Sequence, residues 1–66
     1  KAASATEAAA ASIRFAFDTL GLDRVPSVID PANTPSIRVA ERLGQRPNGE
    51  LMRNGTMRLV YTIERT

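Results

Sequence analysis

The spacing of apolar and polar positions changes along the chain, and the first part has the period of a helix. Four apolar side chains follow the i, i+3, i+4, i+7 spacing of one buried stripe: Ile13, Ala16, Phe17 and Leu20. Ser4 and Glu7 have the spacing of a capping box, which begins a helix. Gly21 supplies the left-handed residue that commonly ends one. We therefore predict a helix between Ser4 and Gly21.

The next segment, Arg24–Asp30, is rich in β-branched residues and is long enough for a short strand. It contains Pro26, which has no N–H to donate to a neighbouring strand. We therefore expect this strand at an edge of a sheet, at a bulge, or where two strands part.

A second helix is predicted after a turn over residues 31–34. Asn33 or Thr34 followed by Pro35 is a strong helix opening, because proline tolerates the first helical positions. Three apolar side chains with helical spacing would face a core: Ile37, Ala40 and Leu43. Gly44 is expected to end this helix after about three turns.

The end of the chain alternates with the period of a strand. Asn54-Gly55, the dipeptide most typical of a two-residue hairpin turn, separates segments 50–53 and 56–64, and we expect a loop through Pro47 and Gly49 before them. The sequence thus predicts an α+β fold in the order helix, strand, helix and β-hairpin, with two helices on a three-stranded sheet. Residues 1–66 would form one domain, with no internal repeat.

Composition limits what such a domain can be. A chain of 66 residues buries only roughly 60% of the surface that it exposes when unfolded. It has neither cysteine nor histidine, so we expect no disulfide and no metal site. Oligomerisation, or a missing remainder of the protein, is the expected compensation. The absence of cysteine fits a cytoplasmic protein.

Charge and hydropathy argue against two classes of partner. No apolar run approaches the roughly 20 residues that cross a bilayer, so no membrane partner is expected. The net charge is +2 and the basic residues are dispersed. Because nucleic-acid binders gather basic residues on one face with aromatics between them, we expect no nucleic-acid partner.

Several stretches, in this order and at this spacing, carry a resemblance to a known family: residues 5–8, 20–25, 30–44 and 53–55. The chain resembles the carboxy-terminal half of a GNAT-superfamily N-acetyltransferase, closest to the branch of ribosomal-protein N-terminal acetyltransferases. The resemblance implies acetyl-CoA as cofactor and transfer of its acetyl group to a primary amine by direct attack. It leaves the acceptor open.

The resemblance also implies site residues. The loop that opens the first helix would hold the cofactor pyrophosphate with backbone N–H groups, through Ala2, Ala3, Ser4, Ala5 and Thr6. The family places glycines about where Lys1 and Ala3 stand, and this chain lacks them. Asn33 and Ser36 would meet the pantetheine arm. Ser36 is the candidate general acid, because Ala40 stands where many relatives have a tyrosine.

The sequence allows other interpretations of these residues and of the chain as a whole. Asn33 and Ser36 also have an ordinary explanation as turn and helix-cap residues. The resemblance implies that a preceding strand and the acceptor loops lie outside this sequence, so the chain alone is not expected to turn over, and its exposed strand edge favours a homo-oligomer. A second hypothesis is a non-catalytic remnant that acts as a small dimerising or binding module. A third is an unrelated α+β domain. The resemblance makes Arg24–Asp30 the fifth strand of the family and the closing hairpin its sixth and seventh, so a strand order other than fifth, seventh, sixth would favour this third hypothesis.

Overall fold

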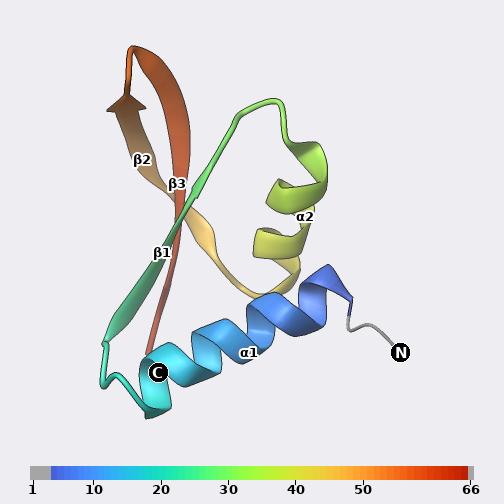
Figure 1. Cartoon of the computed structure of the whole chain (residues 1–66), viewed down its shortest axis with the longest axis vertical. Coiled ribbons are helices and arrows are strands. Elements are labelled where there is room, and N and C mark those ends of the chain that lie inside the picture. The colour runs from blue at the N-terminus through green and yellow to red at the C-terminus, as the bar shows by residue number, and fades with distance from the viewer. Residues whose placement is uncertain (1–3, 66) are drawn as a thin grey trace.

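The computed structural model describes residues 4–65, which form two helices and one antiparallel sheet (Figure 1). In chain order the elements are α1 (Ala5–Asp18), β1 (Arg24–Ile29), α2 (Thr34–Arg42), β2 (Arg46–Arg53) and β3 (Thr56–Glu64). The predicted α+β order of helix, strand, helix and hairpin is confirmed. No helix in this part of the chain is long and apolar enough to span a membrane.

Helix α1 begins at the predicted capping box. The backbone N–H of Ser4 donates to Oε1 of Glu7 at 2.9 Å, and the N–H of Glu7 donates to Oγ of Ser4 at 3.1 Å. The helix ends at Asp18, before the predicted stripe is complete. Leu20 therefore lies beyond the last turn and is 58% exposed, so its expected burial is wrong.

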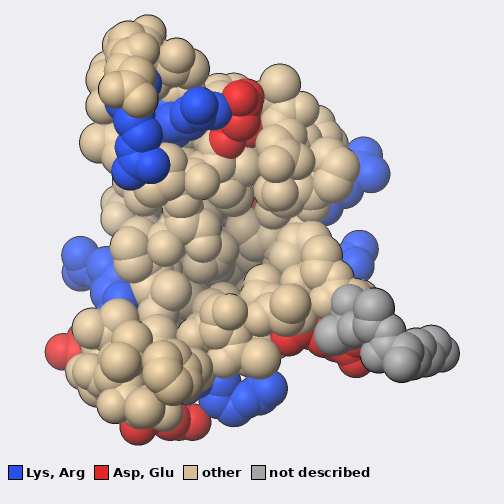
Figure 2. All heavy atoms as spheres, in the orientation of Figure 1, with Lys and Arg blue, Asp and Glu red and all other residues tan. Residues whose placement is uncertain are grey.

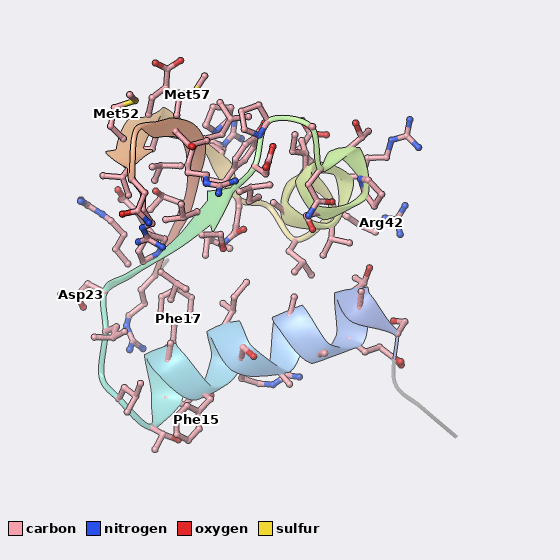
Figure 3. The ribbon with its side chains drawn as sticks, turned by 45° about the horizontal axis from the view of Figure 1, so that its top comes forward. Phe15, Phe17, Asp23, Arg42, Met52 and Met57 are labelled. Carbon is pink, nitrogen blue, oxygen red and sulfur yellow. The ribbon has the colours of Figure 1, made fainter. Side chains whose placement is uncertain are left out.

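The two phenylalanines of α1 point in opposite directions. Figure 3 shows Phe17 directed toward the sheet and Phe15 directed away from it. Ala16 is buried, whereas Phe15 is exposed. Helix α1 thus turns one face to the sheet and leaves an aromatic side chain on its outer face.

Strand β3 lies in the middle of the sheet, and the strand order is β1-β3-β2. This is the order expected from the family resemblance, so the order that would have favoured an unrelated domain is not found. Strand β1 pairs with β3 so that Val25 lies opposite Ile63 and Ser27 lies opposite Tyr61.

The position of Pro26 follows from this pairing. The N–H of Arg65 donates to the carbonyl oxygen of Asp23 at 2.8 Å. Because hydrogen-bonded and non-bonded pairs alternate along an antiparallel ladder, the backbone groups of Val25 and Ser27 face β3, whereas those of Pro26 face the other way. Proline therefore removes a donor from the free edge of the sheet, and the predicted edge position is confirmed.

Strand β2 begins earlier than the sequence predicted. A loop was expected through Pro47 and Gly49, but the strand starts at Arg46 and includes both residues. The register with β3 is irregular between Pro47 and Glu50, where Gly49 has φ = 89°. An edge strand tolerates proline, and a bulge accommodates glycine at positive φ, so neither residue ends the strand.

The core lies between the sheet and α2. Ile29, Ala40 and Tyr61 are buried together, with Ile37 and Leu59 packed against them. This core is small, because no large side chain among the described residues is fully buried. Several large apolar side chains remain exposed: Phe15, Leu20, Leu22, Val28, Leu51, Met52 and Met57.

Candidate functional site

A cavity of about 460 Å³ lies between α1, α2 and β1. Its wall is mainly apolar, formed by Ala5, Ala9, Ile13, Val25, Pro26, Ile29, Val39, Ala40 and Leu43, with Ser12, Ser27, Ser36 and Gln45 as polar members. Figure 2 shows the surface hollowed near the centre of the view, where these elements meet. A mostly apolar cavity of this size with a few convergent polar groups is the ordinary form of a small-molecule site.

The first turn of α1 lies at one end of this cavity, since Ala5 forms part of its wall. The capping box engages the N–H groups of Ser4 and Glu7. Within residues 4–65, the N–H groups of Ala5 and Thr6 donate to no protein atom, as expected for the first turn of a helix. Such donors at a helix N-terminus favour an anion, although the carboxylate of Glu7 sets a negative charge in the same turn.

The first turn of α2 also reaches the cavity. Oδ1 of Asn33 accepts a hydrogen bond from the N–H of Ser36 at 3.3 Å, so Asn33 is the N-cap of this helix. Ser36 forms part of the cavity wall. No acidic side chain lies in this first turn, so the positive end of the helix dipole is not offset there.

The turn before α2 is held by Asp30. Its Oδ1 accepts the N–H of Ala32 at 2.9 Å, and its backbone oxygen accepts the N–H of Asn33 at 2.8 Å. The hydrogen bond from Ala32 is the largest influence and lowers the pKa of the Asp30 carboxyl; desolvation opposes it, and the adjacent guanidinium of Arg58 lowers the pKa further. The Asp30 carboxylate thus fixes the backbone turn that leads into Asn33.

The structure brings some of the predicted site residues together. Ala5 and Ser36 lie in one cavity wall, 31 positions apart in sequence numbering. Ser4 and Asn33 act as the N-caps of the two helices, and Thr6 lies in the first turn of α1 without lining the cavity. Ala2 and Ala3 lie outside the described residues. The predicted roles of all these residues in binding or catalysis stay predictions.

Three polar residues of the cavity were not anticipated: Ser12, Ser27 and Gln45. The alternation in Arg24–Asp30 places Ser27 between Val25 and Ile29 on the inward face, which is the signal that could have found it. Gln45 follows the last turn of α2 and has no such pattern. Its burial comes from the packing of α2 on β1.

The described charges form no continuous basic surface. On the face shown in Figure 2, basic side chains occur at several separate places, and some of them lie beside acidic side chains. Ion pairs join Arg24 to Glu64 and Arg58 to Asp30. Arg38 and Arg42 are exposed on α2. Within residues 4–65, no three acidic side chains gather closely enough to hold a metal ion.

A sequence model of the acetyltransferase (GNAT) domain matches residues 2–46, which is more than half of the chain. The chain belongs to the GNAT acetyltransferase family. The matched region runs from residue 2 to the first residue of β2, so it contains the whole cavity wall of this GNAT chain.

Solved structures of acetyltransferases share the fold of this GNAT chain. A protein from Vibrio cholerae described as a ribosomal-protein-serine acetyltransferase is 30% identical, with a TM-score of 0.80, over 91% of this chain and 38% of its own. An acetyltransferase from Agrobacterium tumefaciens is 37% identical, with a TM-score of 0.77, over 92% and 36%. A GNAT-family acetyltransferase from Bacillus anthracis is 32% identical, with a TM-score of 0.76, over 91% and 40%.

This GNAT chain therefore spans between a third and two fifths of the length of these relatives. A comparison with curated proteins finds no match.

Proposed function

We propose that this chain is the cofactor-binding half of an N-acetyltransferase that uses acetyl-CoA to acetylate a primary amine. The observation that carries the proposal is the cavity of about 460 Å³ bordered by the first turns of both α1 and α2. A long ligand with an anionic end and a narrow arm of apolar and amide segments matches these two features. Family membership supports the reaction type.

Each end of the cavity would have its own role. The N–H groups of Ala5 and Thr6 would bind the pyrophosphate, with Ser4 capping the first turn, and Ala2 and Ala3 would add to this site as the family resemblance implies. Asn33 and Ser36 would meet the pantetheine arm at the first turn of α2. The apolar wall between them would exclude water from the arm.

The chemistry depends on one group of this chain. Acetyl-CoA, when bound, supplies the acetyl group as a thioester. As the amine nitrogen forms its bond to the acetyl carbon, the carbon–sulfur bond breaks, and the hydroxyl of Ser36 would donate its proton to the departing sulfur. The proton that the amine loses would restore this hydroxyl, directly or through water. Ala40 lies in the cavity wall but has no group to donate.

One relative suggests which acceptor to assay first. The relative from Vibrio cholerae is described by its action on a serine of a ribosomal protein. A ribosomal protein with a free amino-terminal serine is therefore the first acceptor to assay. The cytoplasmic location expected from the sequence would bring the protein into the same compartment as such an acceptor.

We also propose that the free edge of β1 is covered by another strand. Residues 1–66 would then be one partial GNAT-like domain, completed by a second copy of the chain or by a preceding amino-terminal half. The support is that β1 pairs on one side only among the described strands, while Val28 is 41% exposed beside this edge.

A calorimetric titration of the protein with acetyl-CoA tests the main proposal, with desulfo-CoA as the control for contacts to the sulfur. We expect saturable binding in the micromolar range, which corresponds to about −8 kcal/mol. Desulfo-CoA should bind more weakly if Ser36 contacts the sulfur, whereas the nucleotide contacts should persist. Absence of heat with both ligands at millimolar protein would contradict the proposal.

A further inference from the structure

A buried amide side chain forms part of the cavity wall. Gln45 is 5% exposed, although glutamine is seldom buried to this degree without a specific partner. Its Nε2 donates to Oγ of Ser27 at 2.9 Å and to the carbonyl oxygen of Val25 at 3.5 Å. Gln45 thereby links the end of α2 to the inward face of β1.

This contact leaves hydrogen-bonding capacity in the cavity. A serine hydroxyl has one proton to donate, and a glutamine side chain has an oxygen that accepts. Within residues 4–65, the hydroxyl of Ser27 donates to no protein atom, and Oε1 of Gln45 accepts no hydrogen bond. Both residues line the cavity.

Ser12, another serine of the wall, behaves differently. Ser12 donates its hydroxyl proton to the carbonyl oxygen of Ala8 at 3.1 Å, one turn back in α1. Its hydrogen-bonding proton is therefore engaged within the helix. Ser27, by contrast, has its oxygen oriented by Gln45 and its proton free.

A ligand that fills the cavity and displaces water must satisfy these two groups, because a buried polar group without a partner is costly. A secondary amide offers both complements: its carbonyl oxygen accepts a proton, and its N–H donates one. We propose that Ser27 and Gln45 form an amide-recognition site, in which Ser27 binds the carbonyl oxygen of an amide in the pantetheine arm. Gln45 acts as a positioning residue for Ser27. This inference rests on the proposed use of acetyl-CoA.

The test is a calorimetric comparison of the intact protein with two ligands. Coenzyme A contains the amide-bearing arm, whereas adenosine 3′,5′-bisphosphate contains the nucleotide and lacks the arm. We expect Ser27→Ala to weaken coenzyme A binding by about fivefold to tenfold, the effect of one neutral hydrogen bond, and to leave the affinity for the bisphosphate unchanged. Gln45→Met, which keeps a similar volume, should give the same ligand-dependent loss.

A conservative variant separates recognition from folding. Ser27→Thr keeps the hydroxyl on a residue that strands favour, so it should bind coenzyme A within about twofold of the parent protein. If the parent protein binds coenzyme A and Ser27→Ala binds it equally well, the amide site is refuted while the proposed function stands. If Ser27→Ala weakens both ligands equally, the residue is structural and the inference is also refuted. If the parent protein binds neither ligand, the proposed function itself fails.

Discussion

Nη1 of Arg58 lies 2.7 Å from Oδ2 of Asp30, so the central strand β3 is tied to the turn that leads into α2. The same carboxylate accepts the N–H of Ala32 through its other oxygen. The Asp30 side chain therefore holds β3 and the turn together and fixes the position of Asn33 at the N-terminus of α2. This arrangement couples the stability of the turn to pH.

The Asp30 carboxylate should stabilise the fold above its pKa. The pKa is lowered in the folded protein, chiefly by the Ala32 N–H and also by Arg58, relative to about 3.9 in the unfolded chain. The stabilisation is therefore present above about pH 4 and is lost as pH falls through the folded-state pKa. We expect Asp30→Asn to lower the thermal midpoint at pH 7 and to differ less from the parent protein at pH 3.

Asp23→Asn is the matched control for this measurement. The side chain of Asp23 is 96% exposed, and its nearest ion-pair atom on Arg65 is 3.8 Å away. Such a pair contributes little, so this variant should melt close to the parent protein at both pH values. An Asp30→Asn variant with an unchanged midpoint at pH 7 would show that the turn does not depend on the carboxylate.

Ser4 offers a way to separate helix capping from anion binding. Ser4→Ala removes the cap and should lower the free energy of unfolding by about 1 kcal/mol in a urea titration. Ser4→Asp keeps a capping side chain but adds a negative charge at the first turn of α1. We expect it to preserve stability and to weaken acetyl-CoA binding by roughly fivefold. Equal affinity in Ser4→Asp and the parent protein would place the pyrophosphate elsewhere.

Ser36→Ala tests the proposed acid. The fold should be unaffected, because Asn33 binds the backbone N–H of Ser36 and not its hydroxyl. If the hydroxyl protonates the departing sulfur, kcat should fall by about 10²-fold, with little change in KM, in an acetyl-transfer assay of the completed enzyme, in which another copy or an amino-terminal half supplies the strand beside β1. A kcat within twofold of the parent value would leave Ser36 as a helix-cap residue alone.

Val28 tests the proposed strand pairing. Its backbone groups face the free edge of β1, and its side chain is partly exposed. A lysine on an edge strand disfavours pairing with another chain, so Val28→Lys should shift the protein toward monomer in sedimentation velocity at high concentration. If the parent protein is already monomeric at that concentration, pairing between copies is excluded.

The hairpin turn gives a prediction that concerns the backbone alone. Gly55 has φ = 77°, and a Cβ atom there would meet no atom within 4 Å. Gly55→Ala should therefore lower the free energy of unfolding by about 1 to 2 kcal/mol through backbone strain and without a steric clash. Asn54→Gly, at φ = 52°, should stay within about 0.5 kcal/mol of the parent protein. Chemical denaturation of the pair distinguishes strain from packing.

Local chemistry made most of the fold predictable from the sequence. The Ser4–Glu7 capping box, Asn33 with Pro35, and Asn54-Gly55 each satisfy backbone groups or torsion angles within a few residues. The structure confirms all three motifs, because each forms without contacts to residues distant in the sequence. The burial of Leu20 and the loop at Pro47 were predicted wrongly, because neither depends on local chemistry alone. The end of α1 and the bulge in β2 depend on how each element packs on the sheet.

The candidate site also combines features that the sequence predicts with features that only the tertiary structure decides. The sequence by itself determined that Ser36 lies in the first turn of one helix and Ala5 in the first turn of another. Only the tertiary structure decided that both line one cavity, and that Gln45 meets Ser27 across 18 positions of the chain. The physical reason is that such contacts arise only when α2 packs on β1. Burial of apolar surface drives this packing, and the hydrophobic effect is not directional, so it does not specify which polar groups will meet. No short-range pattern in the sequence therefore records which polar groups it brings together.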